Sequence, residues 1–211
     1  MKYKYPRTPH LPWSLGYTSD DIHLLDLTQF QNQHVTVTEK MDGENTTLYY
    51  DGLHARSLDS RYHPSRAWIR ALQGQIGWKI PKGWRICGEN LFARHSLAYD
   101  TLSSYFLVFS VWNENNCCLS WQETCSFAAS LGLKTVPVMY SGIWDEHIVR
   151  NLSIDPVRQE GYVVRLSGAF LYSDFSKCIG KWVRKGHVTT DKHWMHSTMI
   201  MNKLEEDDNT N

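Results

Sequence analysis

The stretch Thr38-Glu39-Lys40-Met41-Asp42-Gly43 places a lysine where a predicted strand ends. The residues before it, 34–38, alternate polar with apolar or β-branched side chains, which predicts a half-buried strand. Residues 45–50 are rich in Thr and Tyr, and Asp51-Gly52 is a strong hairpin signal before a returning strand. Lys40 is therefore predicted to lie in a tight loop between strands, where its amine can be held in place. The alternative is a surface lysine beside a turn.

The totals indicate one globular domain. The chain has 211 residues, of which 42% are hydrophobic and 21% charged, enough to bury a sizeable core. No apolar run is long enough to span a bilayer, and the N-terminus lacks the apolar segment of a signal peptide. Five cysteines without a Cys-x-x-Cys pair argue against a disulfide framework or a structural zinc site. We expect a cytoplasmic or nuclear protein that is not secreted.

Basic and acidic residues balance at 22 each, but their distribution is uneven. Eight basic residues lie from position 56 to position 94, and only Asp59 and Glu89 oppose them. A neutral protein with one basic face can bind a polyphosphate backbone through counterion release. The alternative is an ordinary charged surface helix. The candidates for nucleic-acid contact are Arg61, Arg66, Arg70 and Lys79.

Capping residues and helical spacing predict the helices. Residues 1–17 contain three prolines and are expected to form an extended lead-in. Apolar side chains recur at helical spacing after Pro64-Ser65, with Arg66 and Arg70 together on another face. Ser120 and Glu123 form a capping box. The predicted helices begin at Thr18 or Ser19, run from Pro64 to Ile76, and cover residues 121–131 and 145–151.

Period-two and apolar patterns predict the remaining strands. They cover residues 84–91, 105–112, 134–140, 161–166 and 179–183, and Pro137 indicates an edge or a bulge. The mixture of hairpins and interspersed helices favours an α+β domain of mainly antiparallel sheets over a doubly wound parallel fold.

Short motifs follow one another in a fixed order: Lys40-Met41-Asp42-Gly43, Arg56-Ser57, Gly88-Glu89-Asn90-Leu91-Phe92, Phe106-Leu107-Val108-Phe109, Glu160-Gly161-Tyr162-Val163-Val164-Arg165 and Lys181-Trp182-Val183-Arg184-Lys185. The set resembles the nucleotidyltransferase superfamily of polynucleotide ligases and capping enzymes, most closely RNA ligases of the phage nick-sealing type. The resemblance extends from about residue 34 to residue 196. It implies an ATP-grasp-like nucleotidyltransferase domain, with antiparallel sheets flanked by helices.

A lysine becomes a nucleophile only after it loses its proton, so it needs a site that lowers its pKa. We expect Lys181 and a bound metal to do this for Lys40. Attack of Lys40 on the α-phosphorus of ATP would expel pyrophosphate and leave a lysyl-AMP phosphoramidate. The transition state carries negative charge on phosphoryl oxygens, which Arg56, Lys181 and Mg²⁺ or Mn²⁺ suit.

The resemblance also implies the remaining site residues. Glu89 would hold the ribose hydroxyls, Phe109 would stack on adenine, and Glu160 would position the catalytic metal or its waters. Glu39 and Lys185 would contribute to nucleotide binding. Taken singly, Phe109 could be a core residue, Arg56 a solvated hairpin residue, and Glu160-Gly161 a turn before a strand.

Two residues depart from the family pattern. Related ligases usually carry an aspartate after the stacking phenylalanine, where this chain has Ser110. The last motif often reads Lys-x-Lys, but here the second place is Val183. Only Lys185 could share the face of Lys181 on a regular strand, because alternate residues point to opposite faces.

Residues 186–211 are expected to form no OB-fold or accessory domain, and residues 203–211 an acidic disordered tail. We expect an ATP-dependent RNA ligase that joins 5′-phosphate and 3′-hydroxyl RNA ends through lysyl-AMP and an RNA-adenylate, in RNA repair. An accessory protein or domain could act in trans. The alternatives are a non-catalytic nucleotide- or nucleic-acid-binding module and a DNA ligase.

Overall fold

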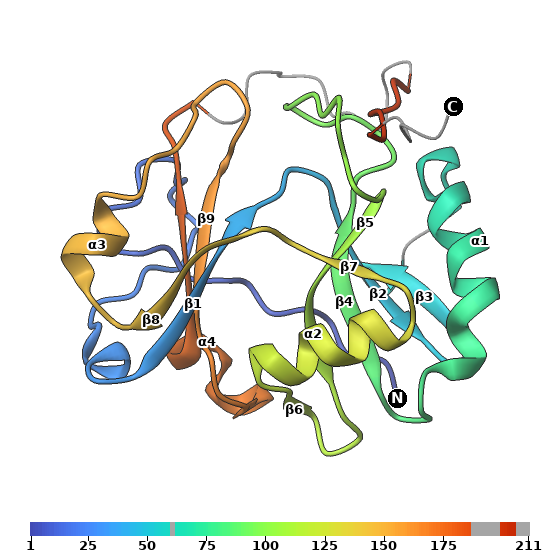
Figure 1. The fold of residues 1–211 in the computed structure, drawn as a ribbon, viewed down its shortest axis with the longest axis horizontal. Helices are drawn as coiled ribbons and strands as arrows, with labels where there is room; N and C mark the ends of the chain where they lie inside the picture. The colour runs from blue at the N-terminus through green and yellow to red at the C-terminus, as the bar shows by residue number, and fades with distance from the viewer. Residues whose placement is uncertain (60–61, 187–198, 206–211) are drawn as a thin grey trace, which may run out of the picture.

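The structure is a computed structural model, and it describes residues 1–59, 62–186 and 199–205. Two sheets lie side by side, with helices on their outer faces (Figure 1). The chain passes from the first sheet to the second through the turn at residues 41–43, directly after Lys40. This mixed α+β architecture with mainly antiparallel pairing confirms the predicted fold class.

The first sheet has four strands in the order β11-β9-β1-β8, and all of its pairs are antiparallel. In β1, Val35 and Val37 point into a core that also contains Phe30 and Tyr162, but Thr36 and Thr38 are buried as well, so the strand predicted to be half-buried is buried on both faces. The bounds of its strands are β1 His34–Lys40, β8 Val138–Ile143, β9 Gly161–Leu166 and β11 Ile179–Val183.

The second sheet has the order β10-β6-β5-β4-β2-β3, and β7 pairs in parallel with β5. Helices α1 and α2 cover one face, where Ile69 and Ala128 share a buried cluster with Leu48 and Val108. Its strands are β2 Glu44–Tyr49, β3 Gly52–Ala55, β4 Arg85–Asn90, β5 Phe106–Trp112, β6 Cys117–Cys118, β7 Lys134–Thr135 and β10 Phe170–Leu171.

The helices are short, and their caps follow from sequence. The capping box at Ser120 and Glu123 is present at the start of α2, as predicted. Asp145 caps α3 by accepting hydrogen bonds from two backbone N–H groups. The bounds are α1 Ala67–Ile76, α2 Trp121–Ser130, α3 Glu146–Arg150 and α4 Phe175–Cys178, with 3₁₀ turns η1 Thr28–Phe30, η2 Pro64–Arg66, η3 Gly77–Lys79 and η4 Tyr172–Asp174.

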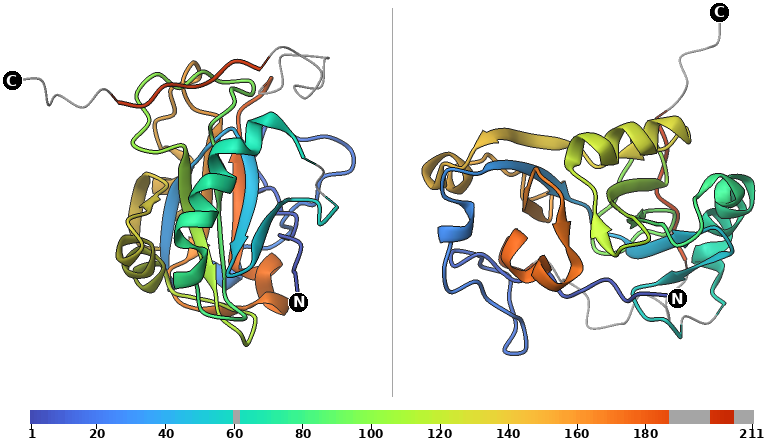
Figure 2. Two further views of the ribbon diagram at one scale, coloured as in Figure 1. Left: turned by 90° about the vertical axis from the view of Figure 1, so that its right-hand side faces the viewer. Right: turned by 90° about the horizontal axis from the view of Figure 1, so that it is seen from below.

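Both ends of the described chain dock onto these sheets (Figures 1 and 2). Near the N-terminus, the Lys181 N–H donates to the Pro9 carbonyl and the Leu11 N–H donates to Lys181, so the lead-in runs beside β11. Near the C-terminus, Asn202 is buried and its amide donates to the carbonyl of Leu91. The N-terminal end therefore supports β11, and the C-terminal end supports the loop that follows β4.

Three predictions about local structure are wrong. Residues 18–21 form a turn instead of a helix, because the chain directly after Asp21 pairs with His10, whose N–H donates to the Ile22 carbonyl and whose carbonyl accepts from the Leu24 N–H. The strand predicted at 134–140 is divided into β7 and β8, since Pro137 cannot donate to a ladder. Residues 203–205 of the predicted disordered tail pair with the loop at 99–102. The rest of that tail lies outside the described residues.

Candidate active site

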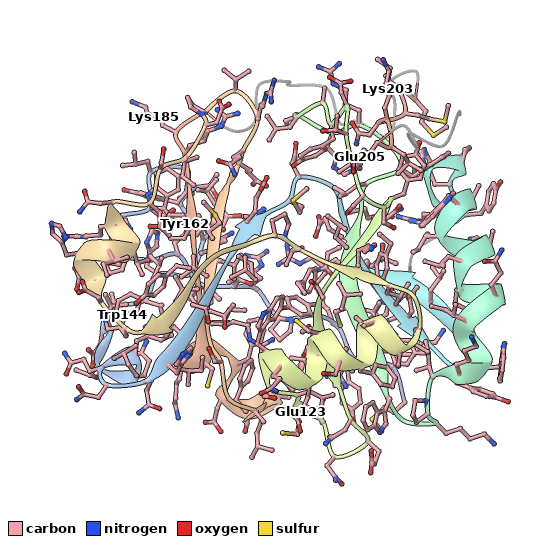
Figure 3. All side chains as sticks on the ribbon, viewed as in Figure 1. Glu123, Trp144, Tyr162, Lys185, Lys203 and Glu205 are labelled. Carbon is pink, nitrogen blue, oxygen red and sulfur yellow. The ribbon has the colours of Figure 1, made fainter. Side chains whose placement is uncertain are left out.

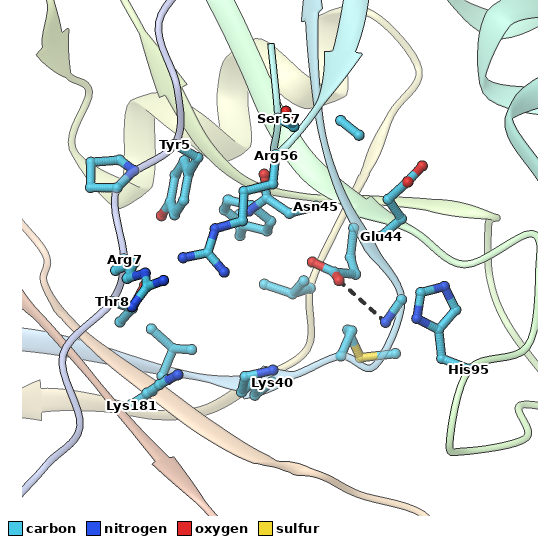
Figure 4. A pocket seen from close by; sticks show the side chains of 18 of the residues that line it. Tyr5, Arg7, Thr8, Lys40, Glu44, Asn45, Arg56, Ser57, His95 and Lys181 are labelled. Atoms are coloured by element: carbon cyan, nitrogen blue, oxygen red, sulfur yellow. Dashed lines mark hydrogen bonds between the residues drawn. The ribbon is translucent and has the colours of Figure 1, made fainter. Parts of the chain in front are cut away.

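A cavity of about 970 Å³ lies between the two sheets, within the size range of small-molecule sites. Most of the predicted site residues line it or reach it (Figure 4). They come from strands of both sheets and from the segment after β3. The lining includes Glu39, Lys40, Arg56, Glu89, Phe109 and Lys181.

Lys40 is the last residue of β1 and not part of a loop as predicted, because its pairing with Gly161 extends the ladder with β9 to this position. This register places Glu160, the residue before β9, beside the lysine side chain. Lys40 Nζ donates to Glu160 Oε2 over 2.6 Å, and the carboxylate side chain is only 8% exposed. The Arg184 backbone N–H and guanidinium hold the same loop by donating to the carbonyls of Glu160 and Gln159.

The charges around Lys40 act against the expected direction of its pKa shift. Burial lowers the pKa of Lys40, but the carboxylates of Glu160 and Glu89 outweigh it, so the pKa lies above its usual value. Burial also lowers the pKa of Lys181, and the nearby Lys40 ammonium lowers it further. The expectation that Lys181 lowers the pKa of Lys40 is therefore not met, because the carboxylates around Lys40 have the larger effect.

The turn after Lys40 explains why an aspartate and a glycine occupy these positions. The Asp42 carboxylate turns away from the cavity and accepts from the Leu97 backbone N–H over 2.7 Å. The Gly43 N–H donates to Glu89 Oε1 over 3.2 Å. A Cβ at Gly43 would lie 2.6 Å from the carbonyl oxygen of Asn90, so only glycine permits this approach to β4. The turn thereby fixes Lys40 relative to Glu89.

Glu89 lies in β4 on the wall opposite Lys40. Burial raises its pKa to about 8, although the Lys40 ammonium acts in the opposite direction. Glu39 also lines the cavity, where its carboxylate accepts from the Gln159 side-chain amide over 3.0 Å. Burial raises the pKa of Glu39 as well. The cavity thus combines several carboxylates with lysine and arginine side chains within a confined volume.

A β-bulge turns Phe109 toward the cavity. In the pairing of β4 with β5, Cys87 faces Ser110 and Gly88 faces Val108, so Phe109 is the extra residue. The ring is half-buried and lies against Tyr5 at 5.1 Å between centroids, edge to face. Phe109 is therefore neither a fully buried core residue nor a freely exposed one.

Ser110 occupies a site that would not suit a carboxylate. Its hydroxyl is buried, accepts from Trp112 Nε1 over 3.0 Å and interacts with the Tyr5 hydroxyl. Phe175 packs on the same cluster. An aspartate in this apolar surrounding would bury a charge, which is costly unless it is paired.

Three cations converge on one side of the cavity. Figure 4 shows the side chains of Arg7, Arg56 and Lys181 directed into the same space. Arg7 comes from the N-terminal lead-in, which the sequence did not connect with the site, and its guanidinium donates to the Asp20 carbonyl. Asp21 lies 3.8 Å from Lys181 Nζ. The arrangement concentrates positive charge where a polyanion can be bound.

The structure places several other predicted residues differently from the prediction. Lys185 is exposed in the turn after β11 and points outward (Figure 3), so it does not line the cavity. Arg66 lines the cavity instead of an exposed basic face: it is buried, and its Nε donates to Glu44 over 2.7 Å, because η2 directs it inward instead of onto the face of Arg70. Arg70 and Lys79 are exposed along α1 and η3. Arg61 lies outside the described residues.

A divalent metal fits the oxygen donors of this site. Within residues 1–59, 62–186 and 199–205, no group of three or more Asp, Glu, His or Cys side chains is arranged to hold a metal. Mg²⁺ commonly uses one or two protein carboxylates and completes its shell with waters and substrate phosphates. Glu160, at the cavity beside Lys40, can provide such a ligand. In the same ranges, no helix is long and apolar enough to cross a bilayer.

A protein-family model described as RNA ligase matches residues 33–183 of this chain. The chain belongs to the RNA ligase family. The matched residues extend from the strand that carries Lys40 to the strand that carries Lys181, so they include both sheets. No curated protein matches this RNA ligase family member in sequence.

Several solved structures share the fold of this chain, although their sequences are less than 20% identical to it. An archaeal ATP-dependent RNA ligase matches with a TM-score of 0.55 and 18% identity, over 85% of this chain and 48% of that one. A mutant RNA ligase of Naegleria gruberi with AMP and Mn matches at 0.53 and 16%, over 87% and 62%. A putative ATP-dependent DNA ligase from Aquifex aeolicus matches at 0.52 and 17%, over 86% and 50%. The chain therefore spans only part of each relative.

Proposed function

We propose that this chain is an ATP-dependent RNA ligase that joins 5′-phosphate and 3′-hydroxyl RNA ends. The observation that carries the proposal is the 2.6 Å contact of Lys40 with Glu160, in a cavity where Arg7, Arg56 and Lys181 converge. The family match and the solved relatives, one of them with AMP and Mn, support it. End joining of this kind is the chemistry of RNA repair.

In the first step, ATP is a substrate and Lys40 is the nucleophile. The Lys40 ammonium first loses a proton, for which Glu160 Oε2, its hydrogen-bond partner at 2.6 Å, is the acceptor. The lone pair of Nζ then forms a bond to the α-phosphorus, the bond from that phosphorus to the bridging oxygen breaks, and pyrophosphate leaves. The nitrogen loses a second proton to solvent, and the product is lysyl-AMP. Arg7, Arg56 and Lys181 bind the phosphates and offset the charge that develops on their oxygens.

The two walls of the cavity would bind different parts of the nucleotide. Phe109 stacks on the base and Glu89 accepts hydrogen bonds from the ribose hydroxyls, both on the second sheet. Glu160, on the first sheet, is the candidate ligand for Mg²⁺ or Mn²⁺, and Glu39 holds the loop before it through Gln159. When bound, the metal supplies positive charge at the phosphoryl oxygens.

The later steps follow from the first. AMP is transferred to an RNA 5′-phosphate, which releases Lys40 and forms an RNA-adenylate. A 3′-hydroxyl then attacks that phosphate, and AMP leaves as the phosphodiester forms. Further RNA-binding parts, in this protein or in a partner, would act together with the cavity.

The test is self-adenylation with α-labelled ATP and Mg²⁺ in the absence of polynucleotide. Wild type is expected to retain label through a denaturing gel, and the bond should break in acid and survive in alkali, as a phosphoramidate does. Lys40→Ala should retain none, while Lys134→Ala, which removes an exposed lysine on β7, should label as wild type does. Unlabelled ATP should compete better than GTP.

Absence of label on wild type, indistinguishable from Lys40→Ala, would favour a non-catalytic binding module. The substrate is tested next, by comparing nicked duplexes in which each strand is RNA or DNA in turn. Sealing that is as fast with DNA on both sides of the nick would identify a DNA ligase instead.

A further inference from the structure

Exposed aromatic rings lie along α1 and around its two ends. Tyr62 is 71% exposed, Trp78 68% and Tyr50 45%. Single exposed rings are common, but three of them around one helix mark this surface as a candidate interaction site. Tyr62 also lines the rim of the cavity, which connects this surface with the proposed active site.

Each of these rings has its own cation. Arg70 Cζ lies 5.8 Å from the centroid of Tyr62, Lys79 Nζ lies 5.3 Å from Trp78, and Lys82 Nζ lies 5.6 Å from Tyr50. The rings and cations come from the β2–β3 hairpin, the segment after β3, α1, η3 and the turn before β4. We call these six residues the aromatic-basic surface.

The backbone brings the members together. The Tyr50 carbonyl accepts from Gln73 Nε2, which anchors the hairpin tip to α1. A Cβ at Gly77 would lie 3.0 Å from the same carbonyl, so Tyr50 sits beside the start of η3 and Trp78. Figure 2, in its left view, faces α1 and shows the β2–β3 region beside it.

The charge of the surface favours a polyanion. No acidic residue occurs between Asp59 and Glu89, and the exposed cations of this stretch are not neutralised by neighbours in sequence. The nearby carboxylates come from other segments. Asp51 is exposed at the hairpin tip, and Glu114 accepts from Trp84 Nε1. Arg66 belongs to the cavity wall, so the cations available here are Arg70, Lys79 and Lys82.

We propose that the aromatic-basic surface binds an unpaired stretch of RNA next to the end that is joined. Bases stack on Tyr62, Trp78 and Tyr50, and phosphates contact the three cations. Rings interleaved with basic groups are typical of single-strand binding, because every base offers a face to stack on whatever its sequence. Arg70 and Trp78 are eight residues apart through the end of α1 and the 3₁₀ turn η3, roughly 13 Å along the axis, about the length of three to four stacked nucleotides.

This inference rests on the proposed function only for the identity of the polyanion as substrate. Binding is measured by fluorescence anisotropy with a labelled 12-nucleotide single-stranded RNA, and with the same strand in a blunt duplex. Trp78→Ala is expected to weaken single-strand binding about 5- to 100-fold, whereas Trp78→Phe retains most of it. Duplex binding should change little, since paired bases cannot stack on the ring.

The contribution of the three cations to RNA binding is tested separately. Changing Arg70, Lys79 and Lys82 together to glutamine should reduce the slope of log affinity against log salt by about 2, at roughly 0.7 per phosphate contact. Inorganic polyphosphate has no bases, so its affinity should fall in this triple variant but not in Trp78→Ala. Leu25→Ala, at a site 96% exposed in the bend before η1, and Lys134→Gln are the matched controls.

Equal single-strand affinity in Trp78→Ala, the triple variant and wild type would overturn the inference. The surface would then be a candidate site for binding another protein. An equal loss with duplex would overturn it too, because stacking would not be the cause. These outcomes are independent of self-adenylation. A protein that fails to label with ATP but loses single-strand binding on Trp78→Ala contradicts the proposed function while supporting this surface.

Discussion

Arg165 Nη1 donates to the carbonyl oxygen of Phe109 over 3.4 Å, and so joins a strand of the first sheet to a strand of the second. The guanidinium is buried and also donates to the carbonyls of Leu119 and Leu166. The Trp121 and Phe170 rings lie close to the guanidinium. The bulge that directs Phe109 into the cavity is thus held from the opposite sheet.

Arg165→Met should destabilise the protein, because it keeps the side-chain length but leaves carbonyl groups without donors. We expect a loss of about 3 kcal/mol in the free energy of unfolding, measured with urea. Arg158→Met, at an exposed position before the same strand, should stay within about 0.5 kcal/mol of wild type. Similar midpoints for both variants would refute a supporting role for Arg165.

Gly43→Ala should impair self-adenylation. The new Cβ would meet the Asn90 carbonyl at 2.6 Å, so the turn must move away from Glu89. We expect a loss of about 1–3 kcal/mol in stability and at least a tenfold slower reaction. In the control variant Gly74→Ala, the new Cβ has no atom within 4 Å, and the free energy of unfolding should rise by roughly 0.5–1 kcal/mol. A fully active Gly43→Ala would show that the turn does not set the position of Lys40.

Arg7→Ala should weaken binding of ATP but not of AMP. The guanidinium points into the cavity beside Lys181, and AMP lacks the outer phosphates that these cations would contact. A lost charge-assisted hydrogen bond of about 1.5–3 kcal/mol corresponds to an affinity roughly 10- to 100-fold lower by calorimetry. Lys4→Ala, at an exposed position in the same segment, serves as control. An equal loss for both nucleotides would place Arg7 away from the outer phosphates.

Asn202→Ala should loosen the loop that holds Asp42. The Asn202 amide donates to Leu91 and its oxygen accepts from the Tyr99 N–H over 3.0 Å, while the Tyr99 hydroxyl accepts from the Asp42 N–H. We expect a loss of about 2 kcal/mol and faster amide hydrogen exchange at residues 97–102. Lys203→Ala keeps the backbone bonds of this segment and should exchange as wild type does. Unchanged protection in Asn202→Ala would mean that the C-terminal segment does not support the loop.

The sequence predicted those parts of the fold that depend on local patterns. β9 and β11 have the predicted bounds, and the capping box at Ser120 starts α2. Pro137 was expected at an edge or a bulge, and the register of β1 with β8 shifts next to it. In each case neighbouring residues carry the physical cause.

The predictions fail where contacts with residues distant in sequence determine the local structure or the direction of a side chain. Arg66 turns inward because Glu44, 22 positions earlier, offers a buried carboxylate. Thr18 forms a turn in place of a helix, since the residues after Asp21 pair with His10. Arg7 enters the cavity only because the lead-in runs along β11. Spacing alone carries no signal for such contacts.

The turn at residues 41–43 has a mechanical consequence. Because the chain changes sheets there, the residues proposed for base and ribose binding stand on one sheet and Glu160 and Lys181 on the other. A ligand that touches both walls adds its binding free energy to the cohesion of the two halves, by mass action. Covalent attachment of AMP to Lys40, as proposed, would hold the nucleotide beside the second sheet for the lifetime of the adduct, so the two halves would be coupled most strongly in the proposed lysyl-AMP form.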